Sequence, residues 1–487
     1  MLKKIFLSNL LLQLALNLIV KPVYVLGVDR GVQNAIGKEA YGTYFSLLGF
    51  SFLFHMLNDF GIQNFTSAHV ARYPHLAQKY FSNLFVCKLL LSSLYVLLTL
   101  AAALLVGYRG SEIGMLGMLM AVQVISSFLL FFRSNIAALG NYFTDSFFSV
   151  FDRLLLILLG LTVLGMGMIR QGDSAVLFII IQIAALGLAS TAAFYSLRNL
   201  TGKTKITFRP HFIRYLLKKG IPYATVVFLM LVYSRTDVVL IERLLPDGKA
   251  EAGIFASTYR LLEAVNSVML IFGTLLLPIF STAIRKKESI AELLQLSVKL
   301  VLFISVTACM LVYYYRFEIS HLLYREATPY WAEMMGVLFW SYIPLSLMYV
   351  LGSLVTASEK VSSGNKIFAA AVLLSLVMNC IFIPLYKSMG AAWVSLLVQS
   401  FVAAALFYLN YTHFRLKPDF RLLGQLFLFC VALWAAAHFS RFLAGFWVLK
   451  CFFIGTFAVV LSISLRFWSI KSLLKLLNEQ RRTVQAD

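Results

Sequence analysis

The chain has 487 residues, of which 60% are hydrophobic and 13% charged, and its formal net charge at pH 7 is +21. A mean hydropathy of +0.84 excludes a soluble globular domain. The Lys and Arg residues fall loop by loop rather than along one polar face, which excludes nucleic acid as a partner. The sequence therefore predicts an all-α polytopic membrane protein.

About fourteen transmembrane helices are predicted, each from an apolar run long enough to cross a hydrocarbon core of roughly 30 Å. The first has no small-residue cleavage site and a second follows directly, so we expect it to be retained rather than removed as a signal peptide. The predicted spans are 5–27, 41–66, 81–107, 114–139, 147–169, 174–197, 217–240, 251–280, 293–315, 331–357, 364–386, 389–412, 422–442 and 445–467.

The loops on the side of the N-terminus carry about 24 of the 42 Lys and Arg residues, against about 11 on the other side. By the positive-inside rule both chain ends are then cytoplasmic, which an even number of spans requires. The loops thus predict a multi-pass protein of a plasma membrane.

Two short sequence matches, at offsets of 211 and 224 residues, indicate an internal repeat. Because equivalent positions are six spans apart, two six-helix lobes would share one orientation and be related by a pseudo-two-fold axis along the membrane normal. The first match aligns Gly42, Tyr44 and Ser46 with Gly253, Phe255 and Ser257, and the second aligns Gly140 and Asn141 with Gly364 and Asn365.

The repeat predicts four parts of the chain. An N-lobe over 1–200 is followed by a basic cytoplasmic connector over 201–216 and a C-lobe over 217–412. Two C-terminal helices and a basic cytoplasmic tail over 413–487 are added to the second lobe.

Charged residues inside a bilayer are costly and usually face a protein interior or a watery cavity. In span 41–66, His55 and Asp59 are four residues apart and share one helix face. Two interpretations stay open for them: a structural pair that joins helices, and a cavity-lining site for a proton or cation. Arg235 and Glu242 share a face, whereas Asp237 points roughly the other way and needs another partner.

Arg260 and Glu263 are three residues apart and can pair within one helix. Asp152 and Arg153 are adjacent and diverge, which favours a place at the membrane interface. Four further basic residues have no acidic neighbour on their own helix within one turn, and each could either line a cavity or extend its stem toward the interface. These residues are Lys21, Lys88, Arg133 and Lys299.

Basic residues outnumber acidic ones within the spans, by about seven to roughly five, which favours an anionic ligand. Phosphate groups are well matched by Arg forks and Lys point charges. No HExxH, GxSxG, Walker A or CxxC motif is present, so we expect neither an enzyme nor a cofactor or metal. The five cysteines are interpreted as packing residues. Energy would come from an ion gradient, the membrane potential or the substrate's own gradient.

Three stretches of sequence resemble the polysaccharide-transporter family of bacterial flippases, within the multidrug/oligosaccharidyl-lipid/polysaccharide exporter superfamily. They are "AIGKEAYGTYFSLLGFSFLFHMLNDFGIQNF", "YSRTDVVLIERLLPDGKAEAGIFASTYRLLE" and "VMNCIFIPLYKSMGAAWVSLLVQ". Together with the number of spans, their order makes the resemblance cover essentially the whole chain. The sequence departs from the family at Lys387, where the family commonly has Gly.

The resemblance implies a V of two six-helix lobes that works by alternating access. Such flippases move undecaprenyl-diphosphate-linked oligosaccharide, for O-antigen, capsule or related glycans, to the periplasmic leaflet of the bacterial inner membrane. The implied partners are the lipid-linked oligosaccharide, membrane lipid and the glycan polymerase machinery. The coupling ion, where there is one, would be Na⁺ or H⁺.

The resemblance also implies roles for particular residues. Arg235 and Arg260 match basic cavity positions, and we add Lys21, Arg133 and Lys299 as candidate substrate-binding residues. Asp237 and Asn379 match polar sites of the coupling-cation region, and Asp59 and His55 are further candidates for ion coupling, although His55 has no identified family counterpart. Glu242 is expected near the periplasmic rim.

Other functions remain open from the sequence. A flippase for the lipid-linked peptidoglycan precursor would share fold, carrier and diphosphate. A cation-coupled multidrug exporter of the same superfamily usually has twelve spans and an acidic cavity. A membrane-embedded glycan polymerase, ligase or acyltransferase would typically show a large periplasmic loop, and the longest outer loops here have only about 15 residues.

Overall fold

The computed structural model describes residues 16–66, 77–170, 175–201, 210–287, 289–358, 360–415, 420–442, 445–465 and 467. Within these residues the chain is helical and contains no strand, as the hydropathy predicts. Its packing divides it into two compact units, Met1–Ser257 and Thr258–Asp487. This division follows contacts and not sequence similarity, so the predicted lobe boundaries stay a prediction.

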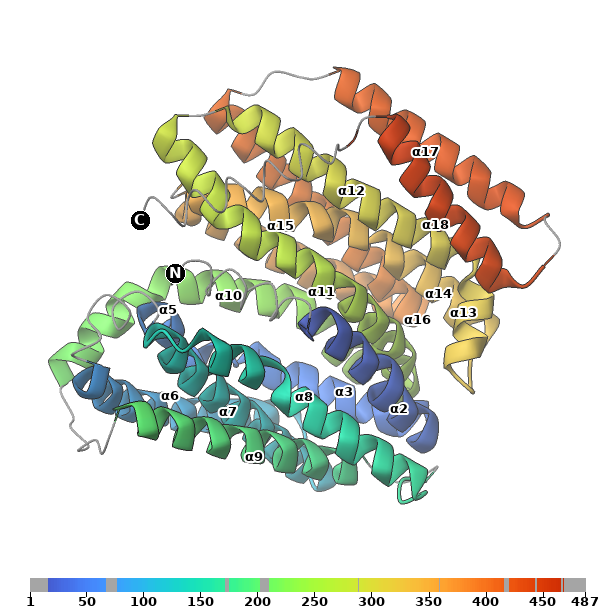
Figure 1. Ribbon diagram of the computed structural model, residues 1–487. Helices are drawn as coiled ribbons and strands as arrows, with labels where there is room; N and C mark the ends of the chain where they lie inside the picture. The colour runs from blue at the N-terminus through green and yellow to red at the C-terminus, as the bar shows by residue number, and fades with distance from the viewer. Residues whose placement is uncertain are drawn as a thin grey trace. The chain divides into compact units, whose positions relative to one another are not determined.

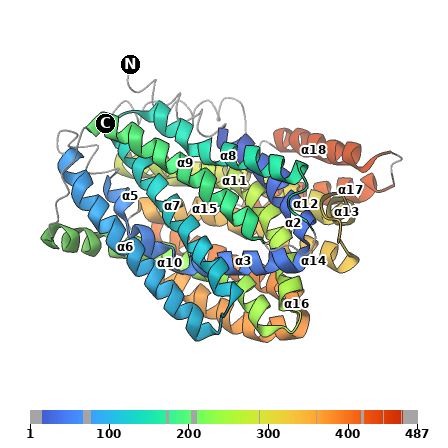
Figure 2. The ribbon, with the colours of Figure 1, turned by 90° about the horizontal axis from the view of Figure 1, so that it is seen from below.

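Unit 1 is built around α7, which packs against α3, α6, α8 and α9. The last three of these helices run beside α7 in both views (Figures 1 and 2). α10 packs against α3. The elements of unit 1 are η1 (Tyr24–Asp29, π-helical), α2 (Arg30–Ile36), α3 (Lys38–Leu53), α4 (Met56–Asp59), α5 (Ile62–Phe65), α6 (Ala77–Val106), α7 (Ser111–Ala138), α8 (Tyr142–Gly165), α9 (Val176–Thr201), α10 (Pro210–Leu244) and the first turns of α11 (Gly248–Lys286).

Unit 2 is built around α12, which packs against α14, α15, α17 and α18, while α16 packs against α14 and α15. The segment between the predicted spans 293–315 and 331–357 contains the two-turn helix α13. The elements of unit 2 after α11 are α12 (Ile290–Tyr314), α13 (Arg316–Leu323), α14 (Pro329–Trp340), α15 (Tyr342–Ala357), α16 (Val361–Phe414), α17 (Phe420–Ser440) and α18 (Trp447–Ser464).

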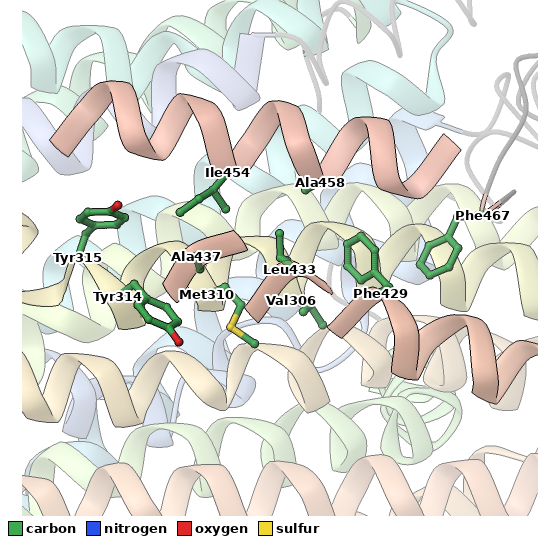
Figure 3. Close-up of a cluster of buried hydrophobic side chains, with 10 residues drawn as sticks. All are labelled: Val306, Met310, Tyr314, Tyr315, Phe429, Leu433, Ala437, Ile454, Ala458 and Phe467. Atoms are coloured by element: carbon green, nitrogen blue, oxygen red, sulfur yellow. The ribbon is translucent and has the colours of Figure 1, made fainter. Parts of the chain in front are cut away.

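The two C-terminal helices α17 and α18 pack on α12 through apolar side chains (Figure 3). Burial of such side chains fixes the pair to unit 2 without a charged contact at its centre. The buried members of this cluster are Val306, Met310, Tyr314, Tyr315, Phe429, Leu433, Ala437, Ile454, Ala458 and Phe467.

Eleven helices of the described residues are long and apolar enough to cross a membrane. One of them, α16, holds two predicted spans, because the backbone leaves the helical region at Lys387 (φ 55°, ψ −137°). Such a positive φ favours Gly, the residue that the resembled family has there. The first predicted span begins outside the described residues, and α3 has only 16 residues. The expected number of fourteen stays a prediction.

Two expectations about individual positions are wrong. The span 41–66 is not one continuous helix, because it is interrupted after Leu53 and again at Phe60. Cys380 is exposed on α16, so the packing role expected of every cysteine does not apply to it. Both deviations depend on neighbouring helices that the hydropathy pattern of one span does not report.

The first turns of α3 and α11 meet backbone to backbone. A Cβ atom on Gly42 would overlap the carbonyl oxygen of Lys249, and a Cβ atom on Gly253 would overlap the carbonyl oxygen of Lys38. Lys249 follows Lys38 by 249 − 38 = 211 residues, the same offset that relates Gly253 to Gly42. The contact is therefore reciprocal between positions that the repeat makes equivalent.

We expect Gly42→Ala and Gly253→Ala each to destabilise the protein by about 1–3 kcal/mol, because the added methyl forces two backbones apart. Thermal unfolding of the detergent-solubilised protein measures this effect. Gly114→Ala on α7 is the matched control, since a Cβ there has no neighbour within 4 Å. Unchanged unfolding of both variants would contradict the close contact.

Candidate functional site

The interruption between α3 and α4 is where polar groups gather in unit 1. Phe54 and His55 form a turn after α3, and the chain takes left-handed conformations at Phe60 (φ 45°) and Gly61 (φ 87°). α10 closes on this segment, because a Cβ atom on Gly220 would overlap the carbonyl oxygen of Phe60. Non-helical backbone at membrane depth is tolerated where protein buries it or where it lines a cavity.

Lys88 of α6 reaches this interruption. Its side chain is fully buried, and its Nζ donates to the backbone carbonyl of Asn58 at 2.6 Å and to Ser127 Oγ. Asp59 Oδ1 lies 3.6 Å from the same nitrogen. The alternative that Lys88 extends toward the membrane interface is therefore wrong, because its partners lie on α4 and α7 inside the protein.

Phe52 connects this group to α10. The guanidinium of Arg235 lies over the Phe52 ring at 4.8 Å from its centroid, and the His55 ring lies 5.6 Å from the same ring. Arg235 is half-buried, and Asp237 on the same helix is buried. The interruption thus pairs the Lys88 ammonium with the Asp59 carboxylate, and the Arg235 guanidinium and the His55 ring both lie against Phe52. A guanidinium suits an anion.

Glu242 anchors a second polar network at the C-terminal end of α10. Its carboxylate accepts hydrogen bonds of 3.0 Å from both Ser46 and Tyr108, and it lies 3.3 Å from Arg243 Nε. Tyr108 lies in the connection between α6 and α7, where burial and the Glu242 carboxylate raise the pKa of its hydroxyl. Tyr108 therefore remains a donor.

The second network extends to two further helices. Glu112 at the start of α7 lies 3.4 Å from Arg243 Nη2 and 2.9 Å from Lys249 Nζ at the start of α11. Glu242 lies in the last turn of α10, and its expected place near the periplasmic rim stays a prediction. Nothing in the sequence indicated Tyr108 or Glu112 as its neighbours. The contacts are those of a structural network.

Two other basic residues of unit 1, Arg133 and Arg153, each lie beside a carboxylate. Arg133 Nε of α7 lies 2.9 Å from Asp145 Oδ1 of α8. Asp152 and Arg153 were expected to diverge, but Arg153 Nε lies 3.5 Å from Asp152 Oδ2, and its guanidinium is 4.9 Å from the Tyr24 ring centroid. Adjacent helical residues can meet in this way because the long Arg stem folds back. Lys21 is half-buried in the first helix.

In unit 2 the expected pair within α11 is confirmed, with Arg260 Nη1 at 3.1 Å from Glu263 Oε2. Lys299 of α12 donates to Gln425 Oε1 of α17 at 2.8 Å. Asn379 is fully buried in α16 and donates to Ser375 one turn earlier. Arg260, Lys299 and Asn379 thus bond to three different residues, Glu263, Gln425 and Ser375.

Asp29 is a buried acid that the sequence reasoning missed. It ends the π-helical segment η1, is 1% exposed, and accepts a 2.6 Å hydrogen bond from Tyr41. The predicted first span ended at residue 27, which placed Asp29 in a loop. If the first predicted span had been continued by two helical turns, Asp29 would have fallen inside it, as a costly charge in the membrane.

The described residues contain no group of three or more His, Cys, Asp or Glu side chains that could hold a metal ion. The groups at the interruption can bind ligands of either charge. The guanidinium of Arg235 can hold an anionic group, and the Asp59 carboxylate and the Asn58 carbonyl can hold a cation. Neither ability requires a covalent step.

Two packed helical units, many apolar spans and charges held inside them define a multi-pass membrane protein with a transporter fold. The lipid II flippase MurJ in an inward closed conformation matches with a TM-score of 0.70 and 16% identity over 95% of this chain and 99% of that one. An inward-facing multidrug resistance MATE family transporter of the MOP superfamily matches with 0.61 and 14% over 83% and 98%.

A MOP superfamily transporter from Pyrococcus furiosus also matches, with a TM-score of 0.60 and 14% identity over 85% of this chain and 96% of that one. Identities this low show the fold alone. The sequence profile of the family described as polysaccharide biosynthesis protein matches residues 15–284, and the chain belongs to that family. The comparison with curated proteins finds no match.

The pair of Arg133 and Asp145 gives a test of a structural role. We expect Arg133→Met and Asp145→Leu each to lower the free energy of unfolding by about 2 kcal/mol, because each leaves a largely buried charge alone. The double variant should recover most of this loss, since it leaves no charge. Denaturation of the purified proteins measures the cycle, and additive losses would contradict the pairing.

Proposed function

We propose that this protein is a flippase for undecaprenyl-diphosphate-linked oligosaccharide. It moves an O-antigen, capsule or related glycan precursor from the cytoplasmic to the periplasmic leaflet of the bacterial inner membrane. Transport proceeds by alternating access between two six-helix lobes. The family membership and the shared transporter fold support the general class, and the finer statement depends on the buried charges.

The observation that carries the proposal is the Arg235 guanidinium beside the interruption of unit 1. Arg235 presents a guanidinium from a membrane-spanning helix, and both this group and the His55 ring lie against Phe52. A guanidinium binds phosphate oxygens through two parallel hydrogen bonds, and in a low-dielectric setting such contacts are strong. A lipid diphosphate combines such a headgroup with a tail that can stay in the bilayer.

The other proposed substrate residues differ in what their side chains already contact. Arg260 shares its charge with Glu263, so it would bind phosphate only with that carboxylate nearby. Arg133 and Lys299 have partners on neighbouring helices, and these contacts favour structural roles for both. Arg235, Arg260 and Lys21 stay the proposed substrate-binding residues, with Arg235 first because its guanidinium lies beside the helix interruption.

Energy for transport is proposed to come from a gradient of H⁺ or Na⁺, because the sequence has no nucleotide-binding loop. Asp237 and Asn379 are the proposed coupling residues of the second half, and both are buried. The Lys and Arg bias of the loops supports cytoplasmic termini. The glycan polymerase machinery is the proposed partner that consumes the product.

A flippase for the lipid-linked peptidoglycan precursor is the second candidate. The similarity to MurJ extends over 95% of this chain and favours this alternative on fold. Both candidates need cations for a lipid diphosphate. The glycan that accumulates in cells without the protein separates them.

The deciding experiment removes the gene and assays the glycan on lipid carriers with an enzyme added outside the cytoplasmic membrane. We expect lipid-linked oligosaccharide to accumulate in the cytoplasmic leaflet, out of reach of the enzyme, and its mass identifies the glycan. Accumulated peptidoglycan precursor would support the second candidate instead. Normal delivery of both the oligosaccharide and the peptidoglycan precursor would contradict both proposed functions.

In the same strain, we expect Arg235→Ala and Arg260→Ala to abolish glycan export while the protein still inserts, because each removes a cation proposed to meet the diphosphate. Membrane levels of each variant are measured in parallel. Arg285→Ala, at the exposed end of α11, is the matched control and should export normally. Wild-type export by both cavity variants would remove these residues from the substrate site.

A further inference from the structure

The ammonium of Lys88 sits among oxygen atoms. The carbonyl oxygen of Asn58 at 2.6 Å and the hydroxyl of Ser127 both accept from Nζ, and a carboxylate oxygen of Asp59 lies at 3.6 Å. The lysine side chain has no exposed surface. These are a backbone carbonyl, a hydroxyl and a carboxylate, which are the ligand types that hard cations prefer.

The chain interruption supplies these oxygens. Asn58 belongs to the four-residue helix α4, which ends at the left-handed Phe60. Because the helix stops there, the Asn58 carbonyl can accept a hydrogen bond from a group outside it. Interrupted helices in transporters use such carbonyls to coordinate alkali-metal ions or protons. Here three separate elements meet around one point: α4, α6 and α7.

Asn58 provides a second observation that points to a ligand. Its residue is fully buried, yet neither the oxygen nor the nitrogen of its side-chain amide has a hydrogen-bond partner. Buried amides are normally satisfied, so an unpartnered one beside an oxygen-lined point indicates a group that binds there. The neighbouring Nδ1 atom of His55 is also buried without a partner.

We propose that Lys88 is a tethered cation that fills an alkali-metal site at the interruption of α3 and α4. While its ammonium is in place, unit 1 holds no Na⁺ at this point, and the Asp59 carboxylate is neutralised by the chain itself. Release of Asp59 then requires movement of the Lys88 side chain rather than loss of an ion to water.

The charge balance predicts what happens when the lysine is shortened. Lys88→Ala leaves a carboxylate near the Asn58 carbonyl and the Ser127 hydroxyl, with space where the stem had been. Oδ1 of Asp59, the oxygen that faces Lys88, is buried, although the side chain as a whole is 25% exposed. A charged oxygen buried without a counter-ion is unfavourable, so a cation is a better occupant than water. The titratable groups beside the site are Asp59, His55 and Cys87.

The experiment compares thermal unfolding of the full-length wild-type and Lys88→Ala proteins in detergent, in NaCl and in choline chloride, with each salt present from membrane extraction onward. We expect no difference between salts for the wild type. For Lys88→Ala, Na⁺ should raise the melting temperature by about 3 °C when it is ~100-fold above its Kd. A Lys88→Ala protein that is folded in NaCl but not in choline chloride supports the proposal equally.

Three control variants make the result specific. Lys88→Met fills the space with an uncharged stem of similar length, so it should show no response to Na⁺. Adding Asp59→Asn to Lys88→Ala should abolish the response, because a ligand is lost. Lys299→Ala removes a lysine of unit 2 that bonds to Gln425, and it should be indifferent to the salt.

Several outcomes would overturn the proposal. They are equal melting temperatures of Lys88→Ala in the two salts, absence of folded Lys88→Ala in both, and stabilisation of this variant by low pH but not by Na⁺. The last would mean that a proton on Asp59 replaces the lysine charge and that no metal site exists. None of these readouts depends on glycan export, so the proposed flippase function stands or falls separately.

Discussion

A charge inside the bilayer must be compensated by another group of the protein, and this constraint organises unit 1. Lys88 joins α6 to α4 and α7, Arg133 of α7 pairs with Asp145 of α8, and Glu242 collects donors from α3 and from the α6–α7 connection. Each contact crosses between helices, because hydrocarbon offers no water to satisfy a lone ion. Apolar contacts alone would allow the helices to slide, since lipid tails are as apolar as the side chains.

Close backbone approach is the second constraint on unit 1. Gly220 lets α10 reach the carbonyl of Phe60, and Gly42 and Gly253 let α3 and α11 meet reciprocally. Small residues serve this purpose in membranes, where packing replaces the hydrophobic effect as the force between helices. A reciprocal contact between positions 211 residues apart is what a two-fold relation between repeated segments would produce.

Both constraints apply at the interrupted span 41–66, where charged and polar groups lie close together. Its backbone supplies a carbonyl to Lys88, its Phe52 ring lies under Arg235, and its Asp59 is the nearby carboxylate. Cation and anion ligands therefore stand side by side in one helical break. The C-terminal pair α17 and α18 is held differently, by an apolar cluster on α12 and by the Lys299–Gln425 hydrogen bond. The helix break is thus held by polar contacts, whereas the C-terminal pair is held mainly by apolar ones.

Hydropathy by itself determined that the chain is an all-helical membrane protein, because a span must satisfy its backbone internally and show about 20 apolar residues. Helical spacing also predicted the Arg260–Glu263 pair, since residues three apart share a face. Only the tertiary structure decided the partner of Lys88, the contact of Arg133 with Asp145 and the burial of Asp29, because these depend on other helices or on an extended first helix. The break after Leu53 was equally hidden, as Phe60 is not a residue that signals a left-handed turn. Periodicity within one helix carries no information about which faces of different helices meet.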